Sequence, residues 1–483
     1  MWKDFSLFNH VSRFSVFVVL LLFSLLNAFL LVKYGLVMSV ALIILLVAFP
    51  IMYFVVAYPK VGIMTLLIVS YILMLIIRIG VNFPLGTLID GLQFLLILGF
   101  FIAQKRNPDW AIYKNPITFI IILWVVYNLL QALNPVAEST LAWLYTIRST
   151  AIVMLMYFIF MYHIKSIKFI RLIFNVWIGL AFFAAAYAFK QEYFGFFKFE
   201  EDYLASDPLI RSLLFIGGQW RKFSIFSDPV AFSFNMVISA VFSIVMLTSD
   251  ISVQKKILYG FLAIFFALTM VYSGTRAAYV LIPAALLLFI VLKLNKTLLF
   301  ASFIGLFFFL ILINIPTSNY NLYRFQTAFK PSDDASFNVR KANQKKIQPY
   351  IQSHPFGGGL GATGTWGERF SPNSYLAKFP PDSGYVRVAV ELGYVGLFLF
   401  CTLMFIILAT GIRNYYLIKD PELKNYCLAM TLIVFALHIG NYPQEALVQL
   451  PTNVYFYLFV ALINITLRLD RKIQSDKLLI NDN

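Results

Sequence analysis

Apolar segments about as long as a membrane is thick follow one another along the whole chain, separated by short polar stretches. A helix that crosses the hydrocarbon core of a bilayer needs about 20 mostly apolar residues. We therefore predict fourteen spanning helices, or twelve to thirteen if a short segment is re-entrant. The predicted spans are residues 14–32, 36–57, 61–77, 87–103, 116–133, 147–162, 172–189, 229–248, 257–272, 277–292, 297–314, 385–411, 426–440 and 453–467.

The composition leads to the same fold class. The 483 residues are 61% hydrophobic and 12% charged, whereas soluble domains are about 45–50% apolar and about 25% charged. A soluble core cannot hide this much apolar surface. We predict an all-α, polytopic membrane helix bundle of about 12–14 transmembrane helices with one long extracytoplasmic loop.

The net charge of +16 has a topological explanation and does not indicate nucleic-acid binding. With the N-terminus inside, the predicted cytoplasmic segments carry 20 lysines and arginines, and the short segments on the opposite face carry 5. Such an excess marks the cytoplasmic side of a membrane protein. We therefore expect a multi-pass bacterial inner-membrane protein with both termini in the cytoplasm.

This topology divides the chain into membrane and outer segments. The first apolar run is too long for the core of a signal peptide and is interpreted as a membrane helix. The expected segments are 1–189, N-terminal membrane helices; 190–228, an outer interfacial loop; 229–314, central membrane helices; 315–384, a large outer loop; 385–467, C-terminal membrane helices; and 468–483, a frayed cytoplasmic tail.

Few residues have the pattern of a cofactor or metal site. The two cysteines, Cys401 and Cys427, both lie inside apolar stretches. This placement argues against a disulfide framework or a zinc site, and we expect neither metal nor cofactor.

Two arginines lie at the outer ends of predicted spans. Arg221 precedes F-S-I-F-S-D-P and a span, and Arg276 closes a tight S-G-T-R turn between two spans. An arginine held at the membrane is costly unless it is paired, and its planar fork suits phosphate. The alternatives are an interfacial anchor for Arg221 and snorkelling to the lipid headgroups for Arg276.

The large loop contains a second group of candidates. Arg340 opens a polar helical stretch that ends before His354-Pro355 and a run of glycines. Gly359, Gly361 and Gly364 match G-x-G-x-x-G formally, but no βαβ unit surrounds them, so a dinucleotide site is rejected. A glycine-rich turn with free backbone donors still suits phosphate. An isolated histidine such as His354 is more often structural than catalytic.

The end of this loop leads into the next span. Asp382 precedes that helix and suits either a helix N-cap or a catalytic carboxylate. Glu391 lies about one helical turn into the membrane, with Arg387 four residues earlier as a partner that neutralises it. Gly393 and Gly396 are explained by close helix packing.

In this order, these motifs resemble the O-antigen ligase/polymerase superfamily of bacterial surface-glycan enzymes. The resemblance covers roughly residues 219–396 and rests on Arg221 with F-S-I-F-S-D-P, S-G-T-R, Arg340 upstream of H-P-F-G-G-G-L-G, and D-S-G-Y followed by E-L-G-Y-V-G-L. It implies a metal-independent, inverting glycosyltransferase at the outer face of the inner membrane. The donor would be a glycan on a polyprenyl pyrophosphate such as undecaprenyl pyrophosphate.

The resemblance also implies roles for individual residues. Arg221 and Arg276 would hold the pyrophosphate with help from Arg340, and Asp382 would act as the catalytic base. His354, Arg387 and Glu391 are candidates for supporting roles. The implied partners are the lipid-linked donor, a glycan or lipid acceptor, membrane lipids and proteins that set polysaccharide chain length.

One departure from the family pattern affects the expected reaction. The ligase branch has His, a small polar residue, nine variable positions and then G-x-x-G. Here Asp382-Ser383 stand at the first two positions, before Gly393 and Gly396. The presumed catalytic histidine is thus an aspartate, which favours a polymerase of O-antigen or exopolysaccharide repeats, or a divergent ligase.

The alternative function is a lipid-linked glycan flippase without transferase activity. Such a transporter needs charged or polar residues at mid-depth in its spans. The predicted spans contain few, and the polar motifs lie in the outer loops. The transferase is therefore favoured over the transporter.

Overall fold

The computed structural model of the protein describes residues 13–80, 86–294, 296–329 and 335–481. Within them the chain is mostly helical with very little strand, and ten helices are long and apolar enough to cross a membrane. These ten are α3 Pro59–Arg78, α4 Gly86–Arg106, α5 Pro116–Leu130, α6 Thr140–His163, α7 Ile167–Tyr193, α10 Pro229–Leu247, α11 Val253–Val271, α17 Gly384–Leu417, α18 Pro421–Gly440 and α19 Thr452–Asn481. The prediction of a polytopic all-α membrane protein is confirmed.

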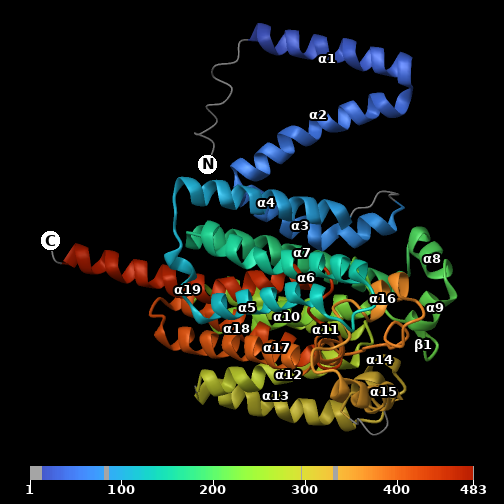
Figure 1. The fold of residues 1–483 in the computed structure, drawn as a ribbon. Helices are drawn as coiled ribbons and strands as arrows, with labels where there is room; N and C mark the ends of the chain where they lie inside the picture. The colour runs from blue at the N-terminus through green and yellow to red at the C-terminus, as the bar shows by residue number, and fades with distance from the viewer. Residues whose placement is uncertain (1–12, 81–85, 295, 330–334, 482–483) are drawn as a thin grey trace.

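Four further long helices contain shorter apolar stretches: α1 Arg13–Tyr34, α2 Leu36–Ala57, α12 Arg276–Leu292 and α13 Lys296–Asn314. These four helices and the ten above coincide in position with the fourteen predicted spans. Helix α1 packs against α2, and both lie at one edge of the bundle (Figure 1). Side chains of α13 such as Phe303 and Phe307 are exposed, as expected of a helix that faces lipid.

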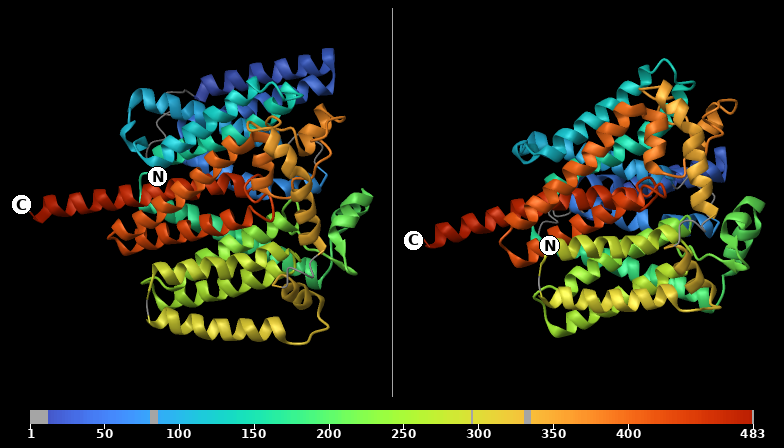
Figure 2. Two further views of the ribbon diagram at one scale, coloured as in Figure 1. Left: turned by 60° about the horizontal axis from the view of Figure 1, so that its bottom comes forward. Right: turned by 90° about the horizontal axis from the view of Figure 1, so that it is seen from below.

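The long helices run side by side, and the longer connections gather at one end of the bundle (Figures 1 and 2). These connections contain α8 Lys198–Ala205, α9 Pro208–Leu214, strands β1 Phe215–Ile216 and β2 Gln219–Trp220, α14 Tyr320–Thr327, α15 Ala335–Ser353 and α16 Gly364–Phe370. The two strands form an antiparallel hairpin. Two 3-10 turns, η2 Ala111–Tyr113 and η3 Gln131–Leu133, flank α5.

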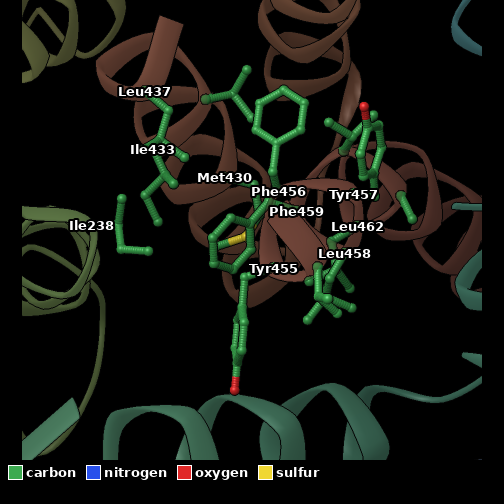
Figure 3. Close-up of a cluster of buried hydrophobic side chains, with 14 of the residues drawn as sticks. Ile238, Met430, Ile433, Leu437, Tyr455, Phe456, Tyr457, Leu458, Phe459 and Leu462 are labelled. Carbon is green, nitrogen blue, oxygen red and sulfur yellow. The ribbon is translucent and has the colours of Figure 1, made fainter. Parts of the chain in front are cut away.

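The core is built around α10, α18 and α19, which contact protein on most of their surface. Figure 3 shows Ile238 of α10 beside Ile433 and Leu437 of α18 and the aromatic rings of α19. The hydroxyl of Tyr455 donates to the carbonyl oxygen of Leu67 on α3 at 3.3 Å. A buried tyrosine needs such a partner in a low-dielectric interior.

The C-terminal segment corrects one prediction. The sequence predicts a frayed tail from Arg468, but α19 continues through this residue to Asn481 and projects from the end opposite the loop helices (Figure 2). Arg468 donates to the carbonyl oxygens of Met161 and Ile164, both at 2.8 Å. These bonds satisfy two carbonyls at the end of α6 and hold the helix across the expected boundary.

Helix α17 is broken at Gly393, where φ is 68° and ψ is −166°. The break removes the usual helical donors from the preceding carbonyls. Gly358 and Gly359 of the large loop donate instead to Val390 and Glu391, each at 2.9 Å. The loop is thereby attached to the mouth of α17, and this attachment positions the candidate site.

Candidate active site

Arg221 follows strand β2 and lies against the S-G-T-R turn. Its Nε donates to the carbonyl oxygen of Ser273 at 2.9 Å, and its Nη2 donates to the hydroxyl of Thr275 at 3.0 Å. A backbone hydrogen bond connects the same two segments, because Lys222 N–H donates to the carbonyl oxygen of Tyr272 at 3.0 Å. Two motifs far apart in the sequence therefore form one structural unit.

The S-G-T-R turn requires glycine at its centre. Gly274 has φ of 59°, in the left-handed region that glycine adopts without strain. Its carbonyl accepts a bond from Arg324 Nε at 2.6 Å. A Cβ at this position would lie 3.0 Å from Arg324 Nε, closer than most Cβ contacts, and in ordinary contact with Arg221 Cγ at 3.5 Å, so a side chain here would displace Arg324.

Arg276 is the first residue of α12, so it lies at the positive end of that helix dipole. The neighbouring helix α10 also begins here, capped by Asp228, whose Oδ1 accepts from Val230 N–H at 2.8 Å and Ala231 N–H at 3.1 Å. Thr275 ties the two helix starts together by donating to the carbonyl of Pro229 at 3.2 Å. Helix N-termini of this kind favour anions.

One cavity of about 600 Å³ brings the predicted residues together. It is lined by Arg221, Arg276, Arg340 and Asp382, as well as by Arg324 and Asp228. Four guanidinium groups against two carboxylates leave an excess of two positive charges around the cavity. The arrangement suits a doubly charged anion held by bidentate hydrogen bonds.

Asp382 does not cap helix α17. The N-cap is Ser383, whose hydroxyl accepts from Val386 N–H at 3.4 Å. Asp382 has φ of 45°, which is strained for a residue other than glycine. Next to it, Gly384 N–H donates to the carbonyl of Asn441 at 2.9 Å, which fixes the segment at the mouth of the helix. The cap alternative for Asp382 is therefore wrong, and its carboxylate lines the cavity.

The environment of Asp382 acts on its acidity in two directions. Desolvation by burial raises the pKa of this carboxyl above its ordinary value, while the charge of Arg340 and a hydrogen bond from Asn343 lower the pKa in part. Both partners come from α15. A carboxylate with a raised pKa is a stronger base than an ordinary aspartate.

Arg387 and Glu391 form the predicted pair, with Nε and Oε1 3.1 Å apart. Arg387 also contacts Glu445, with Nη1 and Oε2 2.8 Å apart. Glu391 in turn accepts from Gly361 N–H at 3.0 Å and from the hydroxyl of Thr363 at 2.5 Å. This network fastens the large loop to α17, outside the arginine cavity.

The glycine-rich turn is not a phosphate site. Its donors are used within the protein, by the bonds from Gly358 and Gly359 to α17 and from Gly361 to the Glu391 carboxylate. A Cβ on Gly357 would lie 2.4 Å from the carbonyl carbon of Glu391. The glycines are needed for a backbone-to-backbone approach, and the G-x-G-x-x-G match has no nucleotide-binding role here.

His354 lies outside the arginine cavity. Its Nδ1 lies 3.0 Å from the carbonyl oxygen of Tyr350 and 2.9 Å from the hydroxyl of Ser353, and its ring stacks on Tyr350. These contacts explain the residue as a cap at the end of α15. It is not among the residues that line the cavity with Asp382 and the arginines.

For two further basic residues of the outer loops, the structure shows whether they line the arginine cavity. Lys222 pairs with Glu192 at 3.1 Å and does not line the cavity. Arg324 does line it, although the sequence analysis missed this residue. The sequence gives little reason to choose Arg324, because it lies in a polar, aromatic stretch without a recognisable motif. Only the fold places it beside Gly274.

A comparison with known protein families gives a match to part of the chain. Residues 261–401 match the family model described as O-antigen ligase, which confirms the resemblance to the O-antigen ligase/polymerase superfamily. The matched segment contains Arg276, Arg324, Arg340 and Asp382, and the match supports a glycosyl-transferring membrane enzyme of polysaccharide biosynthesis. No curated protein sequence matches the chain.

Proposed function

We propose that this O-antigen ligase-like protein transfers a glycan from a polyprenyl-pyrophosphate donor to an acceptor hydroxyl at the outer face of the bacterial inner membrane. The observation that carries the proposal is the single cavity lined by four arginines and Asp382 at the starts of α10, α12 and α17. The charge asymmetry of the short loops supports cytoplasmic termini, with this cavity on the outer side.

The arginines bind the donor pyrophosphate. A pyrophosphate diester carries two negative charges, which equal the excess positive charge of the cavity. Arg221 and Arg324 are held by the turn carbonyls of Ser273 and Gly274. Their positions are thus set before the donor binds, and preorganised charge of this kind is an effective form of transition-state stabilisation.

The transfer step follows from this placement. The acceptor oxygen attacks the anomeric carbon of the donor sugar from the face opposite the pyrophosphate, which inverts that centre. The bond from the anomeric carbon to the pyrophosphate oxygen breaks, and its electron pair stays on the pyrophosphate. Asp382 takes the proton of the acceptor hydroxyl. The arginines supply the positive charge for the leaving group, so the step needs no metal ion.

The aspartate at position 382 supports a polymerase or a divergent ligase over a typical ligase. In either reaction the base needs only to accept a proton as the acceptor oxygen becomes nucleophilic. The raised pKa of Asp382 suits this task. Chain-length regulators and the sugar acceptor are the expected partners of a polymerase.

The decisive experiment compares surface glycans and lipid-linked glycans in strains with and without the gene. Loss of long chains with retention of single repeats identifies a polymerase. Accumulation of long lipid-linked chains that do not reach their final carrier identifies a ligase. Repeats that build up only at the cytoplasmic face would contradict transfer and point to the flippase.

A further inference from the structure

A second cavity, of about 520 Å³, adjoins the arginine cavity. Tyr203 of α8 and Ser227 line both cavities. The second cavity lies between α8 and the loop end of α3, and these two helices contact each other (Figure 1). Its volume lies within the range of small-molecule sites. A ligand in the arginine cavity can therefore extend past Tyr203 into the second cavity.

The walls of the arginine cavity differ in charge. All of its arginines and both of its carboxylates lie outside the segment 198–216, which runs from α8 to β1. This fully described segment contributes no charged residue to the cavity, but it does contribute the aliphatic side chains of Ile210, Leu213, Leu214 and Ile216. A charged wall opposite an aliphatic segment suits a ligand that has an anionic part and a hydrocarbon part. Tyr203 belongs to the same segment, so the second cavity continues from the uncharged wall.

The second cavity presents mostly apolar side chains. Met74, Ile77 and Ile79 line it from α3 and the residue that follows, and Phe199 and Tyr203 line it from α8. Ile77 is 41% exposed and Ile79 is 57% exposed, so both side chains are accessible to a ligand. Burial of such apolar surface against a hydrocarbon chain is favourable in proportion to its area.

The charged groups of the second cavity argue against a second anion site. Arg78 donates from Nη1 to the carbonyl oxygen of Ser224 at 2.9 Å and from Nη2 to that of Phe226. Its Cζ also lies 4.2 Å from the ring centre of Phe223. The guanidinium is thus engaged by the protein, and the other charged side chain on the wall, Asp202, would repel an anion. Hydrocarbon fits this environment better than phosphate does.

The second cavity also reaches into a membrane span. Helix α3 is long and apolar enough to cross a membrane, and Arg78 is its last residue. Met74 lies four residues before Arg78, which corresponds to about one helical turn and roughly 6 Å along the axis. The cavity therefore leads from the loop end of the bundle to the depth at which a span meets lipid tails.

We propose that the second cavity receives the first isoprene units of the donor's polyprenyl chain. The inference rests on the proposed transferase function and adds the orientation of its donor. The pyrophosphate lies among the arginines, and the sugar lies on the side of Asp382. The polyprenyl chain leaves past Tyr203 and runs along Ile77 and Met74 into the bilayer.

The test uses the full-length protein in lipid nanodiscs and measures binding by calorimetry, with empty nanodiscs as the blank. The two probes are inorganic pyrophosphate and geranyl pyrophosphate, which adds a short isoprenoid chain. Ile77→Asn should weaken binding of geranyl pyrophosphate about tenfold, because the chain loses an apolar contact and desolvates an amide. The affinity for pyrophosphate should change less than twofold, which also shows that the variant is folded.

A matched control and an independent variant are available. Leu129 is the second-last residue of α5, as Ile77 is of α3; it is 48% exposed and lines neither of the two cavities. Leu129→Asn should therefore change both affinities less than twofold. Asp202 is exposed on the surface, so its replacement does not disturb the core. Asp202→Leu adds hydrocarbon to the wall and should raise the affinity for geranyl pyrophosphate, relative to that for pyrophosphate, about threefold.

The outcomes separate this inference from the proposed function. The route is overturned if the wild type binds geranyl pyrophosphate no more tightly than pyrophosphate, or if neither Ile77→Asn nor Asp202→Leu changes the ratio of the two affinities. Val339 of α15 is another exposed aliphatic residue of the arginine cavity. An effect of Val339→Asn without an effect of Ile77→Asn would place the chain along α15 and also overturn the route. Absence of pyrophosphate binding to the wild type would instead reject the arginine site of the proposed function.

Discussion

Arg221 donates from Nε to the carbonyl oxygen of Ser273 at 2.9 Å, across 52 positions of the chain. This bond joins the segment before α10 to the turn before α12. It also fixes the guanidinium at the wall of the cavity that contains Arg276. The two arginine motifs thus form one basic surface on the wall of the cavity.

Arg276→Ala should weaken binding of the lipid-linked donor by about tenfold to a hundredfold, because a hydrogen bond to a charged group is worth about 1.5–3 kcal/mol. Arg276→Lys should recover only part of the loss, since lysine lacks the bidentate fork. Donor affinity in nanodiscs is the measurement. Unchanged affinity in both variants would remove Arg276 from the pyrophosphate site.

Arg324→Ala should also weaken donor binding, by about tenfold for the loss of one charged partner. Arg211→Ala is the matched control, because Arg211 lies in the outer loop helix α9 and does not line the cavity. The same donor-binding assay compares the two. Equal affinities in the two variants would show that Arg324 only supports the Gly274 turn.

Asp382→Asn should reduce turnover by about 10²- to 10⁴-fold, the usual contribution of a general base, while donor affinity stays near that of the wild type. Ser383→Ala is the neighbouring control: it removes the N-cap of α17 and costs about 1 kcal/mol of stability, but it should keep most of the turnover. Transfer of labelled glycan measures both. Full turnover in Asp382→Asn would eliminate the base.

The pH dependence of transfer should report the pKa of Asp382. The base acts when deprotonated, so the rate falls as pH falls through its pKa, and the raised pKa places this fall above that of an ordinary aspartate. Arg340 lowers the pKa, so Arg340→Gln should move the acidic limb to higher pH. A profile recorded at saturating donor checks this sign, and a limb that stays in place or moves down would contradict it.

Gly393→Ala should destabilise the protein by more than about 2 kcal/mol, because a positive φ and a steric clash act together. An added Cβ would lie 2.0 Å from the carbonyl oxygen of Pro355. Gly305→Ala is the control, since a Cβ there meets nothing within 4 Å. Thermal unfolding in detergent should show a lower midpoint for the first variant alone.

Hydropathy alone predicted the positions of the long helices, since a membrane demands runs of apolar residues of fixed length. The loops that carry polar motifs could be located for the same reason. Arg221 and Arg276 could be selected because an arginine held at the membrane is costly unless it is paired, whereas Arg340 and the role of Asp382 as base came from the family resemblance. The Arg387–Glu391 pair followed from helical spacing.

Only the tertiary structure decided which loop residues meet. It brought Arg324 to the cavity, left His354 at the end of α15, and gave the N-cap of α17 to Ser383, which leaves the Asp382 carboxylate at the cavity wall. It also used the glycine-rich turn to complete the broken helix at Gly393. Local spacing defines which groups share a helix face, but contacts between distant loops depend on how the helices that carry them pack, and no short sequence window contains that information.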